Sequence, residues 1–262
     1  MDEPTKTTLP PFDRHAFEGM IRKSAILKQW FQPTLEGAEN IPAEGGALLV
    51  SNHGNFGVDL LVLVTLFHER LGRVLRSLGD RVVFATPIFR DLARTMGVIE
   101  GEPEATVRLL QDDELVLVYP GGAKEALSAP EDVYRLQWES NRGFIRTALR
   151  AQKPIIPVAG IGNEELYVQV VSKDRVRESR VGRLVSQFLG DKYVTPLYMG
   201  LGMLPFPTEL HYLIGEPIHL PYGPEAADDD EIVAQLHQQV TEATQQLIYQ
   251  GLDQREPVAA NR

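Results

Sequence analysis

Two short, uninterrupted apolar runs constrain the fold more than any other feature: 47–50 (Ala-Leu-Leu-Val) and 115–119 (Leu-Val-Leu-Val-Tyr). A run with no polar alternation is typical of a strand that is buried on both faces, as in parallel sheets. Each run leads into a loop with two glycines, and helical patterns separate the strands. The sequence therefore predicts a single α/β domain with a mostly parallel, mixed sheet that is flanked by helices.

Further segments extend this alternation. We expect short strands at 35–37, 82–84, 154–159 and 210–214, and helices at 14–31, 59–71, 88–96, 106–111, 141–151 and 228–250. Asp59 is a good residue for a helix start, so its plain structural role would be that of a cap. The last helix is amphipathic, and its expected buried stripe consists of Ile232, Leu236, Val240, Ala243 and Leu247.

Two apolar segments allow more than one interpretation. The helix at 14–31 either faces the core or lies in a membrane interface with Trp30 and Phe31 near the headgroups. The segment 188–207 is apolar but rich in Gly and Pro, and it either lines an acyl groove, touches a bilayer or belongs to the core. Sequence alone does not separate these interpretations.

Charge and composition narrow the partners and the location. The formal net charge of −10 argues against nucleic acid and against a membrane surface held by electrostatics alone, so any membrane contact should be apolar and local. The chain has no cysteine, which excludes thiol nucleophiles and disulfides. No apolar stretch approaches the ~20 residues of a spanning helix, and the N-terminus lacks the pattern of a secretion signal. We expect a cytoplasmic location, with peripheral contact at the inner membrane as an option.

His53 is the best candidate for proton transfer. It directly follows the first apolar run, and imidazole has the ordinary pKa best suited to removing a proton near neutrality. A carboxylate at the other ring nitrogen would fix its tautomer, and Asp59 is within reach if Gly54 and Gly57 let the loop curl back. On spacing alone, such a pair is more often a cap and a loop hydrogen bond than a catalytic pair.

A second loop, Pro120–Glu125, follows the second apolar run. Gly121 and Gly122 can bring backbone N–H groups close to a ligand, Lys124 adds a cation, and Glu125 follows within one turn. The plain alternative is a strand-to-helix turn with a solvated Lys–Glu pair. The chain has no G-x-S-x-G elbow, no complete phosphate-binding glycine loop and no zinc-protease pattern.

Taken together, the two loops resemble the glycerolipid acyltransferase family. The resemblance rests on four motifs in family order: 35–42 (LEGAENIP), Ser51-Asn52-His53 with Asp59, 119–127 (YPGGAKEAL) and 154–157 (PIIP), with 215–218 (GEPI) as a closing strand. The His–Asp spacing is one residue longer than usual, and Gly121 to Lys124 replace the usual Glu-Gly-Thr-Arg. Both departures resemble the diacylglycerol-acyltransferase-like branch, and they favour a neutral or weakly charged acceptor.

The resemblance implies three parts: an N-terminal arm and amphipathic helix at 1–32, the acyltransferase domain at 33–222, and a C-terminal amphipathic helix and tail at 223–262 that pack on it. It also implies acyl transfer from acyl-CoA or acyl carrier protein to a lipid hydroxyl, with His53 as the base and Asp59 as its carboxylate, and with no metal or redox cofactor. The substrate-binding residues would be Asn52, Gly121, Gly122, Lys124, Glu125 and Arg142. Two alternatives remain, a hydrolase using the same site and a non-catalytic lipid-binding protein.

Overall fold

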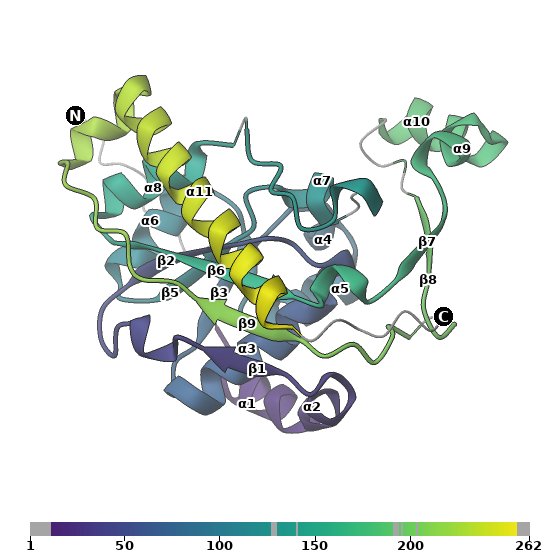
Figure 1. Ribbon diagram of the computed structural model, residues 1–262, viewed down its shortest axis with the longest axis horizontal. Helices are drawn as coiled ribbons and strands as arrows, with labels where there is room; N and C mark the ends of the chain where they lie inside the picture. Colours follow the sequence, from purple (N-terminus) through teal and green to yellow (C-terminus); the bar gives the residue numbers. More distant parts are fainter. Residues whose placement is uncertain are drawn as a thin grey trace.

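The computed structural model describes residues 12–255, except for 127–129, 140, 191–193, 195 and 203. The far ends of the expected N-terminal arm and C-terminal tail lie outside these residues. Seven strands form the main sheet, in the order β1-β9-β6-β2-β5-β3-β4 (Figure 1). Their bounds are β1 Thr34–Glu36, β2 Ala47–Ser51, β3 Leu75–Gly79, β4 Ile99–Glu100, β5 Leu115–Val118, β6 Ile155–Ile161 and β9 His211–Ile214. All neighbours are parallel except β6 and β9, which confirms the mostly parallel, mixed sheet.

Helices cover both faces of this sheet, and β2 shows why its sequence has no polar alternation. Leu49 packs into the core shared with α1, α2 and α3, whereas Leu48 and Val50 pack into the core shared with α6, α8 and α11. The helix bounds are α1 Arg14–Lys23, α2 Ala25–Phe31, α3 Val58–Leu71, α4 Arg81–Ala85, α5 Pro87–Thr95, α6 Pro103–Gln111, α7 Gly122–Ala126, α8 Gly143–Ala151, α9 Lys173–Glu178, α10 Arg180–Leu189 and α11 Asp230–Gln254.

The C-terminal helix α11 packs against β6 and β9 and runs diagonally across the strands in Figure 1. Its buried stripe is rotated from the expected one, because Val233, Thr244 and Ile248 are buried alongside Leu236 and Val240. Ile232, Ala243 and Leu247 lie at the edge of the stripe. The helix packs on the domain, although the three-part division of the chain stays a prediction.

Two expectations about single elements were wrong. The segment 82–84 was expected to be a strand, but it lies in α4, where the side chain of Asp80 accepts from the N–H of Val82 at 2.9 Å and caps the helix. The strand β3 was missed because it contains a buried charge. Arg76 lies in β3, and its Nε donates to the carbonyl of Gly97 at 2.8 Å.

The predicted first helix is two helices, separated at Ser24. The Ser24 hydroxyl donates to the Ile21 carbonyl at 2.7 Å and lies 2.9 Å from the hydroxyl of Thr65 on α3. Phe17 and Phe31 are buried in the core, which supports the core-facing interpretation for these positions. Trp30 is partly exposed at the other side of α2. Within the residues that the structure describes, no helix has both the length and the apolar character needed to cross a bilayer.

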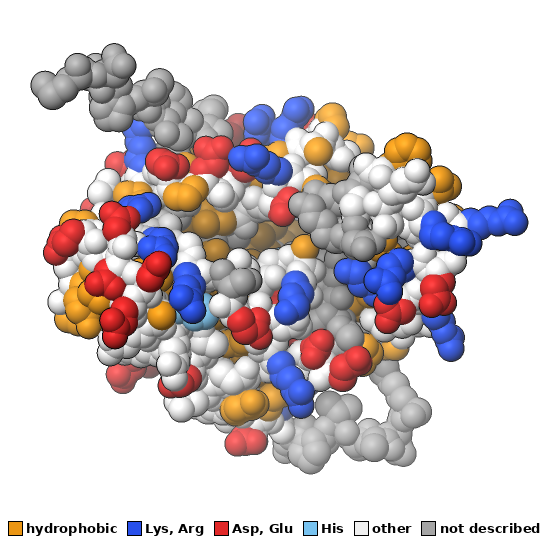
Figure 2. All heavy atoms as spheres, turned by 90° about the horizontal axis from the view of Figure 1, so that it is seen from above, with side chains coloured by type: hydrophobic (Ala, Val, Ile, Leu, Met, Phe, Trp, Pro, Cys, Tyr) orange, Lys and Arg blue, Asp and Glu red, His pale blue; other side chains and the backbone are white. Residues whose placement is uncertain are grey.

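A second, smaller sheet stands apart from this body. It pairs β7 (Val168–Val171) with β8 (Leu197–Met199), and α9 and α10 connect the two strands. We call β7, α9, α10 and β8 the projecting arm, which extends from the sheet and its helices in Figures 1 and 2. The apolar segment 188–207 lies partly in this arm, at 188–189 and 197–199, and Phe188, Leu197 and Met199 are exposed. These residues are therefore not core residues.

Candidate active site

Three loops meet at one edge of the sheet. β2 lies between β5 and β6 and is parallel to both, so the carboxyl ends of these strands lie side by side. The loop 52–57 follows β2, the turn 119–121 follows β5, and the short helix η4 (Asn163–Glu165) follows β6. Reactive residues in open α/β sheets collect at this edge. His53 lies in the loop after β2. Glu125 lies in α7, the short helix that follows the turn after β5. The sequence predicted both placements.

His53 is held by contacts from the neighbouring strand. Its ring stacks on Tyr119, at the end of β5, with 4.2 Å between centroids and 18° between planes. Its backbone N–H donates to Oε2 of Glu125 at 3.2 Å. Burial lowers the pKa of His53 to about 4, because the surroundings disfavour the charged imidazolium. The ring is therefore neutral at pH 7, and a neutral imidazole can accept a proton.

Asp59 is buried in the second position of α3, only 1% exposed. It does not cap the helix, since Gly57 occupies the N-cap position with φ +67°. Its carboxylate lies so close to Gly54 that a Cβ at position 54 would be 2.6 Å from Oδ1. Burial raises the pKa of Asp59 to about 7, and the charge of Glu164 contributes in the same direction.

Unpartnered polar atoms are concentrated around this loop. Nine buried side-chain atoms among the described residues have no hydrogen-bond partner, and four of them lie here: His53 Nδ1, Asp59 Oδ1, Asn55 Oδ1 and the Tyr119 hydroxyl. His53 is thus on the loop and Asp59 directly follows it in α3, but no hydrogen bond joins Nδ1 to Oδ1. Buried polar atoms are normally paired, so a cluster of exceptions is a feature of functional sites.

Asn52, predicted to bind substrate, instead fastens β2 to β6. Its Nδ2 donates to the carbonyl of Gly160 at 2.9 Å, and its Oδ1 accepts from the Gly160 N–H at 2.8 Å. The same Nδ2 reaches Oε1 of Glu164 at 3.0 Å. The side chain is 2% exposed, so the structure places it behind the loop, where it fixes the loop rather than facing a substrate.

The turn after β5 is built around Glu125. This side chain is buried, and its two oxygens accept from the backbone N–H groups of His53 and Gln137 (2.8 Å for the latter). Burial raises the pKa of Glu125 to about 7. Glu125 therefore positions the His53 backbone, and its expected part in substrate binding stays a prediction. The Gly122 N–H is also occupied, because it donates to the Tyr119 carbonyl at 3.0 Å.

The two predicted cations lie at the surface. Lys124 is exposed, and its Nζ is 4.0 Å from Oε2 of the equally exposed Glu139, a pair of little energetic weight. Arg142 is exposed at the start of α8, and its charge acts on His237 of α11. No described contact joins Arg142 to His53. The described residues contain no group of three His, Asp or Glu side chains arranged for a metal ion.

Replacing Gly121 with alanine should reduce activity about tenfold or more, because the new Cβ would overlap Cγ and Cδ of Glu125 and break its bond to the His53 backbone. Initial rates of acyl transfer would measure this. Gly143→Ala is the matched control, since nothing lies within 4 Å of a Cβ there. Equal rates for the two variants would show that the Glu125 contact does not matter.

Two residues near His53 were missed by the sequence analysis. Asn163 hydrogen-bonds Asp59 and opposes the rise in the pKa of its carboxyl. Glu164 accepts from Asn52 and, through Oε2, from the backbone N–H of Tyr134 at 2.9 Å. Both directly follow β6 in the run Gly162-Asn163-Glu164. The same rule that led to His53, polar residues at the end of a buried strand, would have found them.

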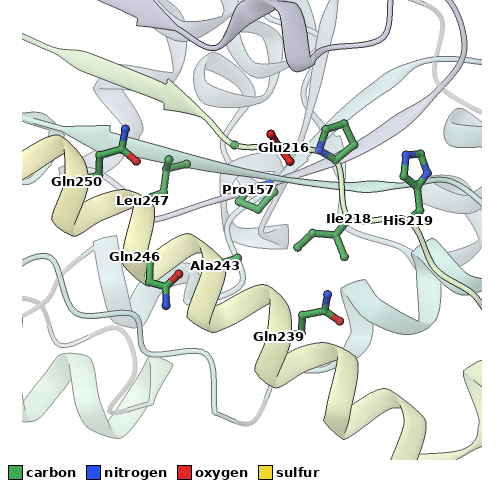
Figure 3. Close-up of a pocket in the computed structure, with 11 residues that line it drawn as sticks. Pro157, Glu216, Ile218, His219, Gln239, Ala243, Gln246, Leu247 and Gln250 are labelled. Carbon is green, nitrogen blue, oxygen red and sulfur yellow. The ribbon is translucent and has the colours of Figure 1, made fainter.

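Two surface hollows of the described residues lie away from this loop. One, of about 480 Å³, lies between α11 and the segment after β9, with Glu216, His219 and Gln239 among its lining residues (Figure 3). Another, of about 620 Å³, is lined mainly by apolar side chains of α1, α2, α3 and α5. Neither lining includes His53 or Asp59.

Comparisons with known proteins show the family of this chain. The family described as diacylglycerol acyltransferase matches residues 45–255. An uncharacterized protein of Mycobacterium tuberculosis is 34% identical over 252 residues, which cover 92% of this chain and 68% of that protein. The "DGAT1/2-independent enzyme synthesizing storage lipids" of Bos taurus is 31% identical over 225 residues, which cover 84% of this chain and 60% of that protein.

A solved structure agrees on the fold. The crystal structure of PlsC from Thermotoga maritima, a 1-acyl-sn-glycerophosphate (LPA) acyltransferase, aligns with a TM-score of 0.57 and 16% identity, covering 92% of this chain and 81% of that one. At this level of sequence identity, the structural similarity is evidence for the fold alone. With the family match and the relatives, the resemblance seen in the two loops is confirmed: the chain belongs to the diacylglycerol acyltransferase family, within the glycerolipid acyltransferases, and is an acyltransferase.

Proposed function

We propose that the chain transfers a fatty acyl group from an acyl thioester, acyl-CoA or acyl carrier protein, to the hydroxyl of a lipid acceptor at a membrane surface. His53 is the general base, and Asp59 is the carboxylate that stabilises its charged form. The observation that carries the proposal is the cluster of unpartnered atoms: His53 Nδ1, in the loop after β2, and Asp59 Oδ1, at the start of α3, are buried, each without a partner. Catalytic hydrogen bonds of this kind often close only in the substrate complex.

The proton moves through His53 in two steps. The neutral imidazole takes the proton of the acceptor hydroxyl as that oxygen attacks the thioester carbonyl, forming a tetrahedral intermediate. The intermediate collapses, the C–S bond breaks, and the imidazolium returns the proton to the leaving thiolate. An ester and a free thiol result, with no covalent acyl-enzyme, which agrees with a chain that has no cysteine.

The electrostatics of the loop support this division of roles. Burial keeps His53 neutral before the reaction, and it makes the imidazolium costly unless a negative charge is close. Asp59 provides that charge when it is ionised, and its position is fixed by Gly54, Asn163 and the start of α3. Tyr119 holds the ring plane by stacking.

The acceptor is a neutral or weakly charged lipid alcohol, such as an acylglycerol, a lysophospholipid or a long-chain alcohol. Gly121 and Gly122 leave the turn after β5 without the side chains that would hold a phosphate. Lys124 is solvated and paired with Glu139, and Arg142 is exposed. These features support an acceptor without a strong negative charge next to the hydroxyl.

The rate should rise with pH through an apparent pKa near 7. Protonated Asp59 cannot stabilise the imidazolium, so kcat/KM is expected to increase between pH 5.5 and 8 as the carboxyl, with its pKa raised to about 7, ionises. A pH profile with saturating acyl donor would measure this. In Asp59→Asn the rise should disappear. If the rise in rate persists, it reflects the ionisation of Glu125, whose pKa is also about 7, and the assigned role of Asp59 is wrong.

Product analysis tests the reaction itself. Purified protein would be incubated with radiolabelled acyl-CoA and, in separate reactions, a diacylglycerol, a monoacylglycerol, a lysophospholipid and a long-chain alcohol. Thin-layer chromatography separates new ester from free fatty acid. Label in an ester that depends on the acceptor supports the proposal. Free fatty acid alone, with every acceptor present, would show that water is the acyl acceptor and that the site acts as a hydrolase.

A further inference from the structure

The projecting arm exposes several apolar side chains. In α10, Val181, Leu184 and Phe188 follow one another at intervals of three and four residues and are 69%, 55% and 76% exposed. One face of the small sheet of β7 and β8 carries four exposed apolar residues: Val168, Val170, Leu197 and Met199. Exposed apolar side chains gathered in this way mark an interaction site.

The arm is also basic, in a chain that is acidic overall. Between residues 173 and 184 five exposed basic side chains outnumber two acidic ones, whereas the whole chain carries −10: Lys173, Arg175, Arg177, Arg180 and Arg183 against Asp174 and Glu178. Figure 2 shows Lys and Arg side chains gathered on the arm, at the right of the molecule. With helical periodicity, Arg183 lies on the side of α10 opposite Val181 and Phe188, whereas Arg180 flanks the stripe one turn before Leu184.

We propose that the projecting arm is a bilayer-docking element, which inserts the apolar stripe of α10 into a lipid surface that contains anionic headgroups. A helix with an apolar stripe and a basic polar face lies in the plane of such an interface, its stripe among the acyl chains and its cations at the phosphates. The small sheet of β7 and β8 supports this proposal. A lone two-stranded sheet is only marginally stable in water, and burial of its exposed face stabilises it.

The root of the arm touches the loop that carries His53. Phe56, in this loop, makes edge-on ring contacts with Tyr167 at 5.2 Å and with Tyr198 of β8 at 5.3 Å. Docking therefore brings the loop close to the lipid from which an acceptor would come. This link to acceptor delivery rests on the proposed function, whereas docking itself requires no turnover.

Vesicle sedimentation with the full chain tests the docking. The protein should pellet with vesicles of phosphatidylcholine mixed with phosphatidylglycerol, and less with phosphatidylcholine alone. The combined variant Val181→Ser, Leu184→Ser, Phe188→Ser should lose affinity for the mixed vesicles at least about tenfold. Tyr249→Ser, an exposed aromatic on α11, is the control and should bind like the unmodified chain. The variant with Arg180→Gln and Arg183→Gln should lose only the part of the binding that depends on phosphatidylglycerol.

A fluorescent reporter gives a second readout. The indole introduced by Phe188→Trp should shift its emission to shorter wavelength when mixed vesicles are added, because it enters the apolar layer. Each of three results would overturn the proposal. The unmodified chain does not pellet with vesicles, the serine variant binds like the unmodified chain, or the emission of the indole does not shift. Acyl transfer to a short-chain, water-soluble alcohol is measured in parallel. Loss of vesicle binding with this transfer intact means that docking and chemistry are separate, and loss of transfer alone counts against the proposed function and not against the arm.

Discussion

Replacing His53 with alanine should reduce acyl transfer by about 10²–10⁴-fold, the usual contribution of a general base. Without the imidazole, the acceptor hydroxyl has to lose its proton to water while it attacks the thioester. The loop itself should remain folded, because the backbone N–H of residue 53 still donates to Glu125 in the variant. The measurement is the initial rate of ester formation from labelled acyl-CoA.

Two further variants separate chemistry from folding. His53→Gln retains most of the packing on Tyr119 but has no basic nitrogen, so it should lose as much activity as the alanine variant. His219→Ala removes an exposed histidine from the hollow beside α11 and should leave the rate unchanged. Circular dichroism would check that all three are folded. Ester formation at the unmodified rate in His53→Gln would exclude His53 as the base.

The sequence was sufficient for the central part of the fold, for a physical reason. The runs at 47–50 and 115–119 are apolar at every position because each strand lies between two helical layers, and such runs have few other uses in a chain of this length. The strand β3 has no such run, since its buried Arg76 is accommodated by a hydrogen bond to the distant Gly97. Contacts of that kind depend on the tertiary structure and leave no local signal.

The site was predictable in part for the same reason. His53 and the Gly121–Glu125 turn follow strands that are easy to recognise, so their meeting at one sheet edge could be inferred. The direction of each side chain could not. Asn52 and Glu125 turn inward to satisfy backbone groups of β6 and of the His53 loop, and Arg142 stays in solvent. Residue type and position suggest substrate contacts for all three, but hydrogen-bond satisfaction decides where the first two point.

Replacing Asp59 with asparagine should lower activity strongly, on the order of 10²–10⁴-fold, and at the same time stabilise the protein at pH 8. The loss follows because an amide cannot balance the charge of the imidazolium. The gain follows from the burial of a carboxylate whose Oδ1 has no partner. Its folded pKa is raised from 3.8 to about 7, so its favourable contribution is complete below pH 3.8 and is lost as the pH rises to 7.

At pH 8 the ionised Asp59 should therefore cost on the order of a few kcal/mol, which asparagine avoids; each kcal/mol regained raises Tm by roughly 2–4 °C in a protein of this size. Thermal unfolding at pH 8 and pH 5 would measure the difference, which should be smaller at pH 5. Asp113→Asn is the control. Lys153 lowers the pKa of this exposed carboxyl, which is opposite to the shift at Asp59, so replacing Asp113 should not raise the stability at pH 8. An asparagine variant that is both inactive and less stable at pH 8 would mean that Asp59 holds the loop together. A variant that is inactive but more stable would show that the buried charge of Asp59 destabilises the fold and serves only the reaction.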